Sequence, residues 1–149
     1  MPFCLQCDEA KTVQLSNGNI LMSVRQTGER GYVISTDGGA TWGTQKKWSD
    51  LVSNACNGDI IRYNHGGHNF LLHSLPNSMN REDVALFISR DEGKTWQMQK
   101  VLCPGRSCYS SLSVLPDGRI AFYVERDIDN GGKYELWYQC FTIDWLLSE

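Results

Sequence analysis

No stretch of this 149-residue sequence is apolar over the roughly 18 residues that a membrane-spanning helix needs. Basic runs are also missing, and the formal net charge is only −3. Nucleic acid and anionic membrane surfaces are therefore poor candidates for partners. The first residues lack a charged segment followed by an apolar one, so we expect no signal peptide in this chain, and its localisation stays open.

Cysteine is sparse, with six residues at positions 4, 7, 56, 103, 108 and 140. An even number suits disulfides, but so few cysteines define no framework. Cys4 and Cys7 form a C-x-x-C pair without the second Cys or His pair that a zinc site requires. His65 and His68 are interpreted as turn residues. We expect mostly free, structural thiols, no metal and no cofactor, and the disulfide state is left open.

No amphipathic helix is predicted anywhere. Three β-hairpins are expected at intervals of about 50 residues. Their turns lie at residues 16–18, 64–69 and 116–118, between predicted strands 12–15 and 20–25, 59–63 and 70–74, and 112–115 and 119–124. Third strands are predicted at 31–35, 84–89 and 134–143, and fourth strands at 44–47 and 97–101 only.

A motif recurs at residues 35–42 and 89–96, where both segments read S-x-D-x-G-x-T-W. Asp37 and Asp91 can accept bonds from backbone amides in their own loops, and glycine permits the positive φ of such turns. Trp42 and Trp96 are expected to bury their rings between neighbouring sheets. Two unrelated Asp-Gly turns are the alternative, which the five shared positions disfavour. The repeat predicts stacked units, with four-stranded propeller blades as the leading candidate.

The predicted fold is all-β, one domain over residues 1–149 with about three blades of four-stranded antiparallel sheet. Their approximate bounds are 9–50, 51–103 and 104–149, and the last blade lacks a strand. Three blades do not close a ring, because propellers have four to eight. An open arc would expose apolar faces and an unpaired edge. We therefore expect that another chain closes the arc, or that this sequence is part of a longer protein.

Several segments together resemble one family. They are residues 8–11 followed by Arg25, and residues 80–84, 103–112, 123–125 and 141–146. In order and spacing they resemble the C-terminal half of a bacterial exo-α-sialidase (neuraminidase), a six-bladed propeller family that carries these repeated turns as Asp boxes. The resemblance implies a partial six-bladed propeller, with the missing N-terminal half as its partner. Members of the family are often secreted, periplasmic or surface-bound.

The resemblance implies that Tyr109 is the nucleophile and Glu9 the base that activates it. Sialic acid carries a carboxylate on its anomeric carbon, which would repel a carboxylate nucleophile, so sialidases use a neutral tyrosine instead. Tyrosine titrates near 10, so a nearby base must take its proton. As alternatives, Tyr109 could be a buried aromatic and Glu9 an ordinary surface acid.

Three arginines grip the substrate carboxylate in this family, because a guanidinium offers planar, bidentate hydrogen bonds. By position, Arg25 resembles the second arginine and Arg81 the third, and Glu125 resembles the residue that supports the first. Arg62 and Arg106 are interpreted as surface cations. The first arginine and the acid/base aspartate have no counterpart in this sequence.

The implied function is hydrolysis of terminal α-linked sialic acid, with retention, from glycans, glycoproteins or glycolipids. Asp37, Trp42, Asp91 and Trp96 are assigned to structure, away from the central site. Hydrolase and trans-sialidase activity are not separated, nor is the linkage preference. One alternative is a non-catalytic Asp-box propeller that binds a glycan or a protein, and another is a fragment without activity.

Overall fold

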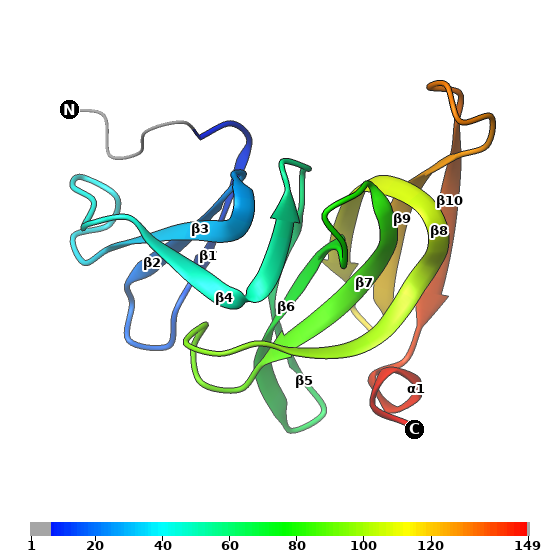
Figure 1. The fold of residues 1–149 in the computed structure, drawn as a ribbon. Coiled ribbons are helices and arrows are strands. Elements are labelled where there is room, and N and C mark those ends of the chain that lie inside the picture. The colour runs from blue at the N-terminus through cyan, green and yellow to red at the C-terminus, as the bar shows by residue number, and fades with distance from the viewer. Residues whose placement is uncertain (1–6, 149) are drawn as a thin grey trace.

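The computed structural model describes residues 7–148, which form ten strands and one short helix. The strands make two antiparallel sheets, which lie side by side in Figure 1. The first sheet is a four-stranded meander in the order β1-β2-β3-β4. Its strands are β1 (Ala10–Gln14), β2 (Ile20–Val24), β3 (Thr27–Ser35) and β4 (Lys46–Asn54).

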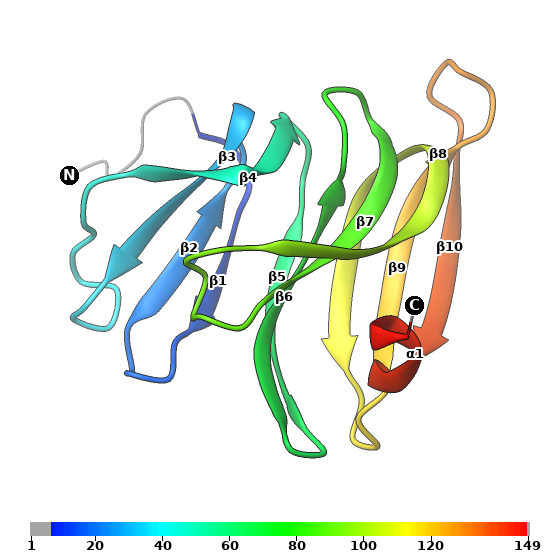
Figure 2. The same cartoon turned by 60° about the horizontal axis from the view of Figure 1, so that its bottom comes forward.

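The second sheet has six strands in the order β10-β9-β8-β7-β6-β5. Its strands are β5 (Asp59–His65), β6 (His68–Pro76), β7 (Glu82–Ser89), β8 (Gln97–Val114), β9 (Ile120–Asp127) and β10 (Tyr134–Phe141). The first part of β8 pairs with β7 and the second with β9, with a register shift between Ser107 and Ser110. The long β8 curves the sheet into a half-barrel (Figures 1 and 2).

The prediction of an all-β fold of antiparallel sheets is confirmed, and the first sheet has the four strands expected of a blade. The second sheet joins six strands instead, and several strand ends differ from those expected. The strand expected at 44–47 is β4, which begins at Lys46 and continues to Asn54. The strands expected at 97–101 and 112–115 are two parts of the continuous β8. The expectation of no helix was wrong, because Ile143–Leu147 form α1, whose first turn is capped by the Thr142 side chain.

The first Asp box is a closed hydrogen-bonded turn. The Ser35 hydroxyl donates to one oxygen of Asp37 at 2.8 Å and accepts from the Gly39 amide at 2.8 Å. Thr41 donates to Asp37 from its amide at 2.9 Å and from its hydroxyl at 2.6 Å. The bonds from Thr41 and Ser35 lower the pKa of Asp37 to about 2. The second box repeats these contacts at Ser89, Asp91, Gly93 and Thr95.

The two sheets pack against each other through a cluster of aromatic rings. Trp96 is buried and meets Trp48 and His73 edge to face, at centroid distances of 5.4 Å for each. Trp48 also donates its indole N–H to the Gly93 carbonyl at 2.6 Å. The expected burial between sheets is confirmed for Trp96. It was wrong for Trp42, which is half-buried, because its loop lies on the side of the first sheet far from the second (Figures 1 and 2).

The cysteines follow the expectation in part. Cys56, Cys103, Cys108 and Cys140 are free thiols, whereas Cys7 is in a disulfide bond, and Cys4 lies outside the described residues. The described part of the chain holds no helix with the length and apolar character to cross a bilayer.

Candidate active site

Glu9 and Arg25 meet where the first sheet begins. Glu9 immediately precedes β1 and Arg25 immediately follows β2, so the antiparallel register brings them together. The Arg25 amide donates to the Glu9 carbonyl at 3.1 Å, and Arg25 Nη1 donates to Glu9 Oε2 at 2.6 Å. Asp8 Oδ2 lies 3.8 Å from Arg25 Nε. The side chain of Arg25 is only 15% exposed, so its pairing with Glu9 is partly shielded from water.

Tyr109 comes from the second sheet and completes this cluster. It lies in β8, inside the register shift between Ser107 and Ser110. Its hydroxyl accepts a hydrogen bond from Arg25 Nη1 at 3.0 Å and donates to Glu9 Oε1 at 3.3 Å. A carboxylate therefore faces the phenolic proton while a guanidinium faces the phenolic oxygen. The carboxylate is thus within hydrogen-bond reach of the tyrosine hydroxyl, as a general base must be of the group whose proton it takes.

Electrostatics keep both charged partners ionised. The pKa of Glu9 is lowered by its own backbone N–H and by hydrogen bonds from Arg25 and Tyr109, against the opposing effect of burial. Burial disfavours the charge of Arg25, but hydrogen bonds with Glu9 and Tyr109 outweigh it and raise the pKa of Arg25. Glu9 is therefore a carboxylate able to accept a proton at neutral pH.

Arg81 lies on the other side of the tyrosine ring. It precedes β7, and its guanidinium carbon is 5.4 Å from the centroid of the Tyr109 ring, within the range of a cation–π contact. Its Nη2 also donates to the Ala55 carbonyl at 3.4 Å. The structure thus brings Glu9, Arg25, Arg81 and Tyr109 together from both sheets.

Glu125 reaches this neighbourhood through Cys108. It lies in β9, and one of its carboxylate oxygens accepts from the Cys108 thiol at 3.3 Å. Burial raises the pKa of the Cys108 thiol to about 11, so it stays protonated and can donate. Glu125 therefore lies beside the chain segment of Tyr109 rather than against the tyrosine hydroxyl.

A buried polar row beneath the site was missed by the sequence analysis. Arg30 Nε donates to Ser23 Oγ at 2.9 Å, and Ser23 Oγ lies 2.8 Å from His73 Nε2. The next residue of β6, Ser74, lies 2.9 Å from the hydroxyl of Ser110, the neighbour of Tyr109. Burial and the charge of Arg30 hold the pKa of His73 well below its usual range, so this histidine is neutral. The available signal was Arg30 itself, a charge directly before an apolar strand segment.

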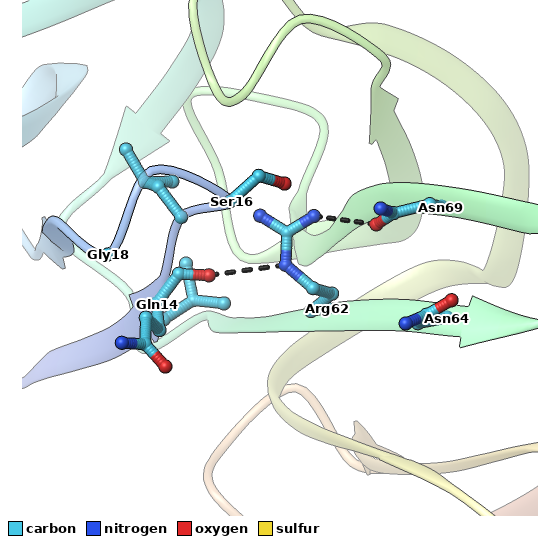
Figure 3. A pocket seen from close by; sticks show the side chains of 8 residues that line it. Gln14, Ser16, Gly18, Arg62, Asn64 and Asn69 are labelled. Carbon is cyan, nitrogen blue, oxygen red and sulfur yellow. Dashed lines mark hydrogen bonds between the residues drawn. The ribbon is translucent and has the colours of Figure 1, made fainter.

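A pocket of about 480 Å³ opens at the opposite ends of the strands (Figure 3). Arg62 lies at its centre but is already paired. It donates to both oxygens of Glu92 at 3.1 and 2.7 Å, to Asn69 at 2.7 Å and to the Gln14 carbonyl at 3.2 Å. Arg62 thus joins strands of the two sheets, and its positive charge is compensated by the carboxylate of Glu92. Arg106 is likewise paired, with Asp127 at 2.9 Å.

The Asp boxes lie at the same end as this pocket. Ile20 is paired with Ser35, whereas Val24 is paired with Gly31, so Asp37 follows the end of the sheet remote from Arg25. The corresponding pairing of Leu71 with Ser89 places Asp91 at that end of the second sheet. The boxes therefore do not contact the Glu9–Tyr109 cluster.

Comparison with known proteins agrees with this architecture. Residues 5–122 match the family model described as a BNR repeat-like domain. The chain belongs to the BNR repeat-like family. A sialidase from Micromonospora viridifaciens is 34% identical over 128 residues, which cover 79% of this chain and 20% of that protein. This chain thus spans about a fifth of the length of that sialidase.

Solved structures show the same fold. An intramolecular trans-sialidase from Ruminococcus gnavus superposes with a TM-score of 0.78 at 24% identity, covering 95% of this chain and 34% of that one. A sialidase variant from Streptococcus pneumoniae gives a TM-score of 0.79 at 24% identity, covering 91% and 23%. The resemblance to sialidases is confirmed, and the two sheets have the fold of part of a sialidase propeller.

Proposed function

We propose that this chain contributes the tyrosine nucleophile, its base and two carboxylate-binding arginines to the active site of an exo-α-sialidase. The observation that carries the proposal is the contact of the Tyr109 hydroxyl with Glu9 and Arg25. Glu9 and Arg25 come from the first sheet and Tyr109 from the second, and together they place an ionised pair against a phenol.

The reaction begins with the attack of the Tyr109 oxygen on the anomeric carbon of sialic acid. The phenolic proton passes to Glu9 as the new carbon–oxygen bond forms and the glycosidic bond breaks. The leaving oxygen takes its proton from an acid outside this chain. Water then attacks the same carbon and gives its proton to the conjugate base of that outside acid. The bond between this carbon and the Tyr109 oxygen breaks, Glu9 returns its proton to that oxygen, and sialic acid is released with retained configuration.

The arginines supply charge for the substrate carboxylate. Arg25 and Arg81 flank Tyr109, one at its hydroxyl and one over its ring. A carboxylate on the anomeric carbon would accept charge-assisted bonds from both while that carbon faces the tyrosine oxygen. The remaining arginine of the three, the first in chain order, would be supported by Glu125. In this proposal it belongs to the N-terminal half of the propeller.

The N-terminal half is proposed as the partner that closes the arc over residues 1–149, with blades near 9–50, 51–103 and 104–149. Strand β10 lies at the edge of the second sheet, and Leu136 and Tyr138 on it are 64% and 65% exposed. A strand with large apolar side chains at an open edge favours coverage by another sheet.

The proposal is tested on a complete protein that carries this chain, with a fluorogenic sialoside as substrate and N-acetylneuraminic acid as ligand. Hydrolysis of the sialoside is expected. Binding of the ligand without hydrolysis would support the alternative, a non-catalytic Asp-box propeller that binds glycans. Absence of both would exclude a sialic acid site.

A further inference from the structure

Arg30 is a fully buried cation without a carboxylate partner among the described residues. Its Nε donates to Ser23 Oγ at 2.9 Å and its Nη1 to the Cys56 carbonyl at 2.8 Å, whereas its buried Nη2 makes no hydrogen bond. Burial lowers the pKa of Arg30 to about 10, so it is still protonated at neutral pH. A buried, incompletely paired guanidinium costs free energy.

The contact of Arg30 with the Cys56 carbonyl fixes the turn between β4 and β5. Ala55, next to Cys56, has a φ of 56°, a left-handed conformation that is uncommon for alanine. The Ala55 amide donates to the Gln26 carbonyl at 3.2 Å, directly after Arg25. The Ala55 carbonyl accepts from Arg81 Nη2 at 3.4 Å. One residue in a strained conformation thus touches both arginine segments.

Asn54 ties the same turn to the loop that carries Arg81. Its side-chain amide donates to the Ser78 carbonyl at 3.3 Å and to the Asn80 carbonyl. The turn of residues 54–56 is therefore held on one side by Arg30 and on the other by the residues just before Arg81. Strained turns persist where surrounding contacts fix them, which is the case here.

We propose that Arg30 is a positioning residue, which sets the place of Arg81 beside Tyr109 through the turn of residues 54–56. The inference rests on the proposed function of Arg81 and extends it. Arg30 itself is buried below the site and touches no substrate. The separation of the two carboxylate-binding cations then depends on the hydrogen bond from Arg30 to the Cys56 carbonyl together with those from Asn54.

Two variants disturb this link from opposite sides. Arg30→Lys keeps the charge but cannot bond Ser23 and the Cys56 carbonyl from a planar fork. Asn54→Ala leaves Arg30 intact and releases the turn from Ser78 and Asn80, at a site that is not fully buried. Arg62→Lys is the matched control, because it weakens an arginine contact between the sheets at the far end of the strands.

The first measurement is hydrogen–deuterium exchange by mass spectrometry on the 149-residue chain. Arg30→Lys and Asn54→Ala should raise exchange in the peptides that contain residues 54–56 and 78–81, whereas Arg62→Lys should not. This readout needs no ligand, so it tests the link even where the proposed function fails. Unchanged exchange at 78–81 in Asn54→Ala and Arg30→Lys would overturn the inference.

The second measurement is a ligand-observed NMR titration of a complete protein that carries this chain, with N-acetylneuraminic acid as ligand. Arg30→Lys and Asn54→Ala should each weaken binding by roughly tenfold, the size expected when one charge-assisted contact is loosened. In an Arg81→Ala background, Arg30→Lys should cause no further loss. An additional tenfold loss in that background would show that Arg30 does not act through Arg81. A complete protein with the unmodified sequence that binds no ligand would count against the proposed function alone.

Discussion

The Tyr109 hydroxyl donates a hydrogen bond to Glu9 across 3.3 Å, although the two residues are 100 positions apart in the sequence. The contact joins the second sheet to the start of the first, and Arg25 bonds both partners. Formation of this cluster therefore depends on the packing of the two sheets. That packing is set by Trp48 and Trp96, which lie between them.

Removing the tyrosine hydroxyl should stop chemistry and spare binding. In a complete protein that carries this chain, Tyr109→Phe is expected to lower kcat by at least about 10²-fold, because the nucleophile is gone, while KM changes little. Tyr123→Phe is the control, since Tyr123 lies in β9 and is half-buried. Normal hydrolysis of a fluorogenic sialoside by Tyr109→Phe would assign the nucleophile to another residue.

The ionisation of Glu9 should depend on Arg25. The pKa of Glu9 lies below its ordinary value of 4.5, and the hydrogen bond from Arg25 contributes to that shift. Arg25→Met should therefore raise the pKa of Glu9. If Glu9 acts as the base, activity is lost as the pH falls through this pKa, so the acidic limb should move to higher pH.

A carboxyl-carbon NMR titration of the 149-residue chain measures this pKa without requiring activity. Arg62→Met serves as the control, because Arg62 pairs with Glu92 at the other ends of the strands. A Glu9 pKa that is the same in Arg25→Met and in the unmodified chain would show that Arg25 does not bias its ionisation.

The repeated motif and the hairpins were enough to predict the type of fold. Each Asp box closes on itself within seven residues, from Ser35 to Thr41, so its structure is local and readable from sequence. The unbroken course of β8 depends on its pairing with both β7 and β9, and hairpin signals carry no information on that pairing. The helix α1 was missed although its cap, Thr142, is local. Residue type also failed to distinguish Trp42 from Trp96, because burial depends on which sheet lies opposite.

The site was predictable only through resemblance. Taken alone, Glu9 is an ordinary acid before a strand. Its proposed role as a base comes from its contacts with Arg25 and Tyr109. Arg30 belongs to no family segment that the sequence analysis used, and its side chain shows its importance only through full burial and its bond to the Cys56 carbonyl. The roles of Tyr109, Glu9, Arg25, Arg81 and Glu125 remain predictions.

The two Asp boxes should differ in their contribution to stability, although their hydrogen bonds are nearly the same. Gly93 of the second box contacts Trp48 at the interface of the sheets, whereas the first box lies away from it. Asp91→Asn should lower the free energy of unfolding by about 1–2 kcal/mol. Asp37→Asn should cost less, and comparison of the two by chemical denaturation checks this. An equal or larger effect of Asp37→Asn would contradict the role given to the interface.

The hydrogen bonds of Asp37 should make the free energy of unfolding depend on pH in acid. The pKa of Asp37 is about 2 in the folded chain, below its ordinary value of 3.8. A lowered folded pKa contributes stability above the unfolded value, and this contribution is lost as the pH falls from about 4 towards 2. In Asp37→Asn that part of the pH dependence should disappear. The free energy of unfolding is measured at pH 5 and at pH 2.5 for the unmodified chain and for Asp37→Asn. If it falls by the same amount between the two pH values in both chains, the assignment is refuted.

The last prediction concerns the 149-residue chain by itself. It supplies two carboxylate-binding arginines in our proposal, and neither the third nor the general acid. Loss of one arginine weakens binding by about one to two orders of magnitude, and loss of the acid costs a further factor of roughly 10²–10⁴. We therefore expect little or no turnover of a fluorogenic sialoside, and self-association through β10, measured by light scattering.

Leu136→Ser with Tyr138→Ser should reduce that self-association, because both side chains are exposed on the edge strand. Ile128→Ser is the control, since Ile128 is 52% exposed but lies in the turn after β9. Addition of the N-terminal half of a related sialidase propeller should restore turnover to the unmodified chain and less to the double variant, because the same edge would bind it. A monomeric chain that hydrolyses the sialoside unaided would refute this account and would require an acid and a third cation from within these residues.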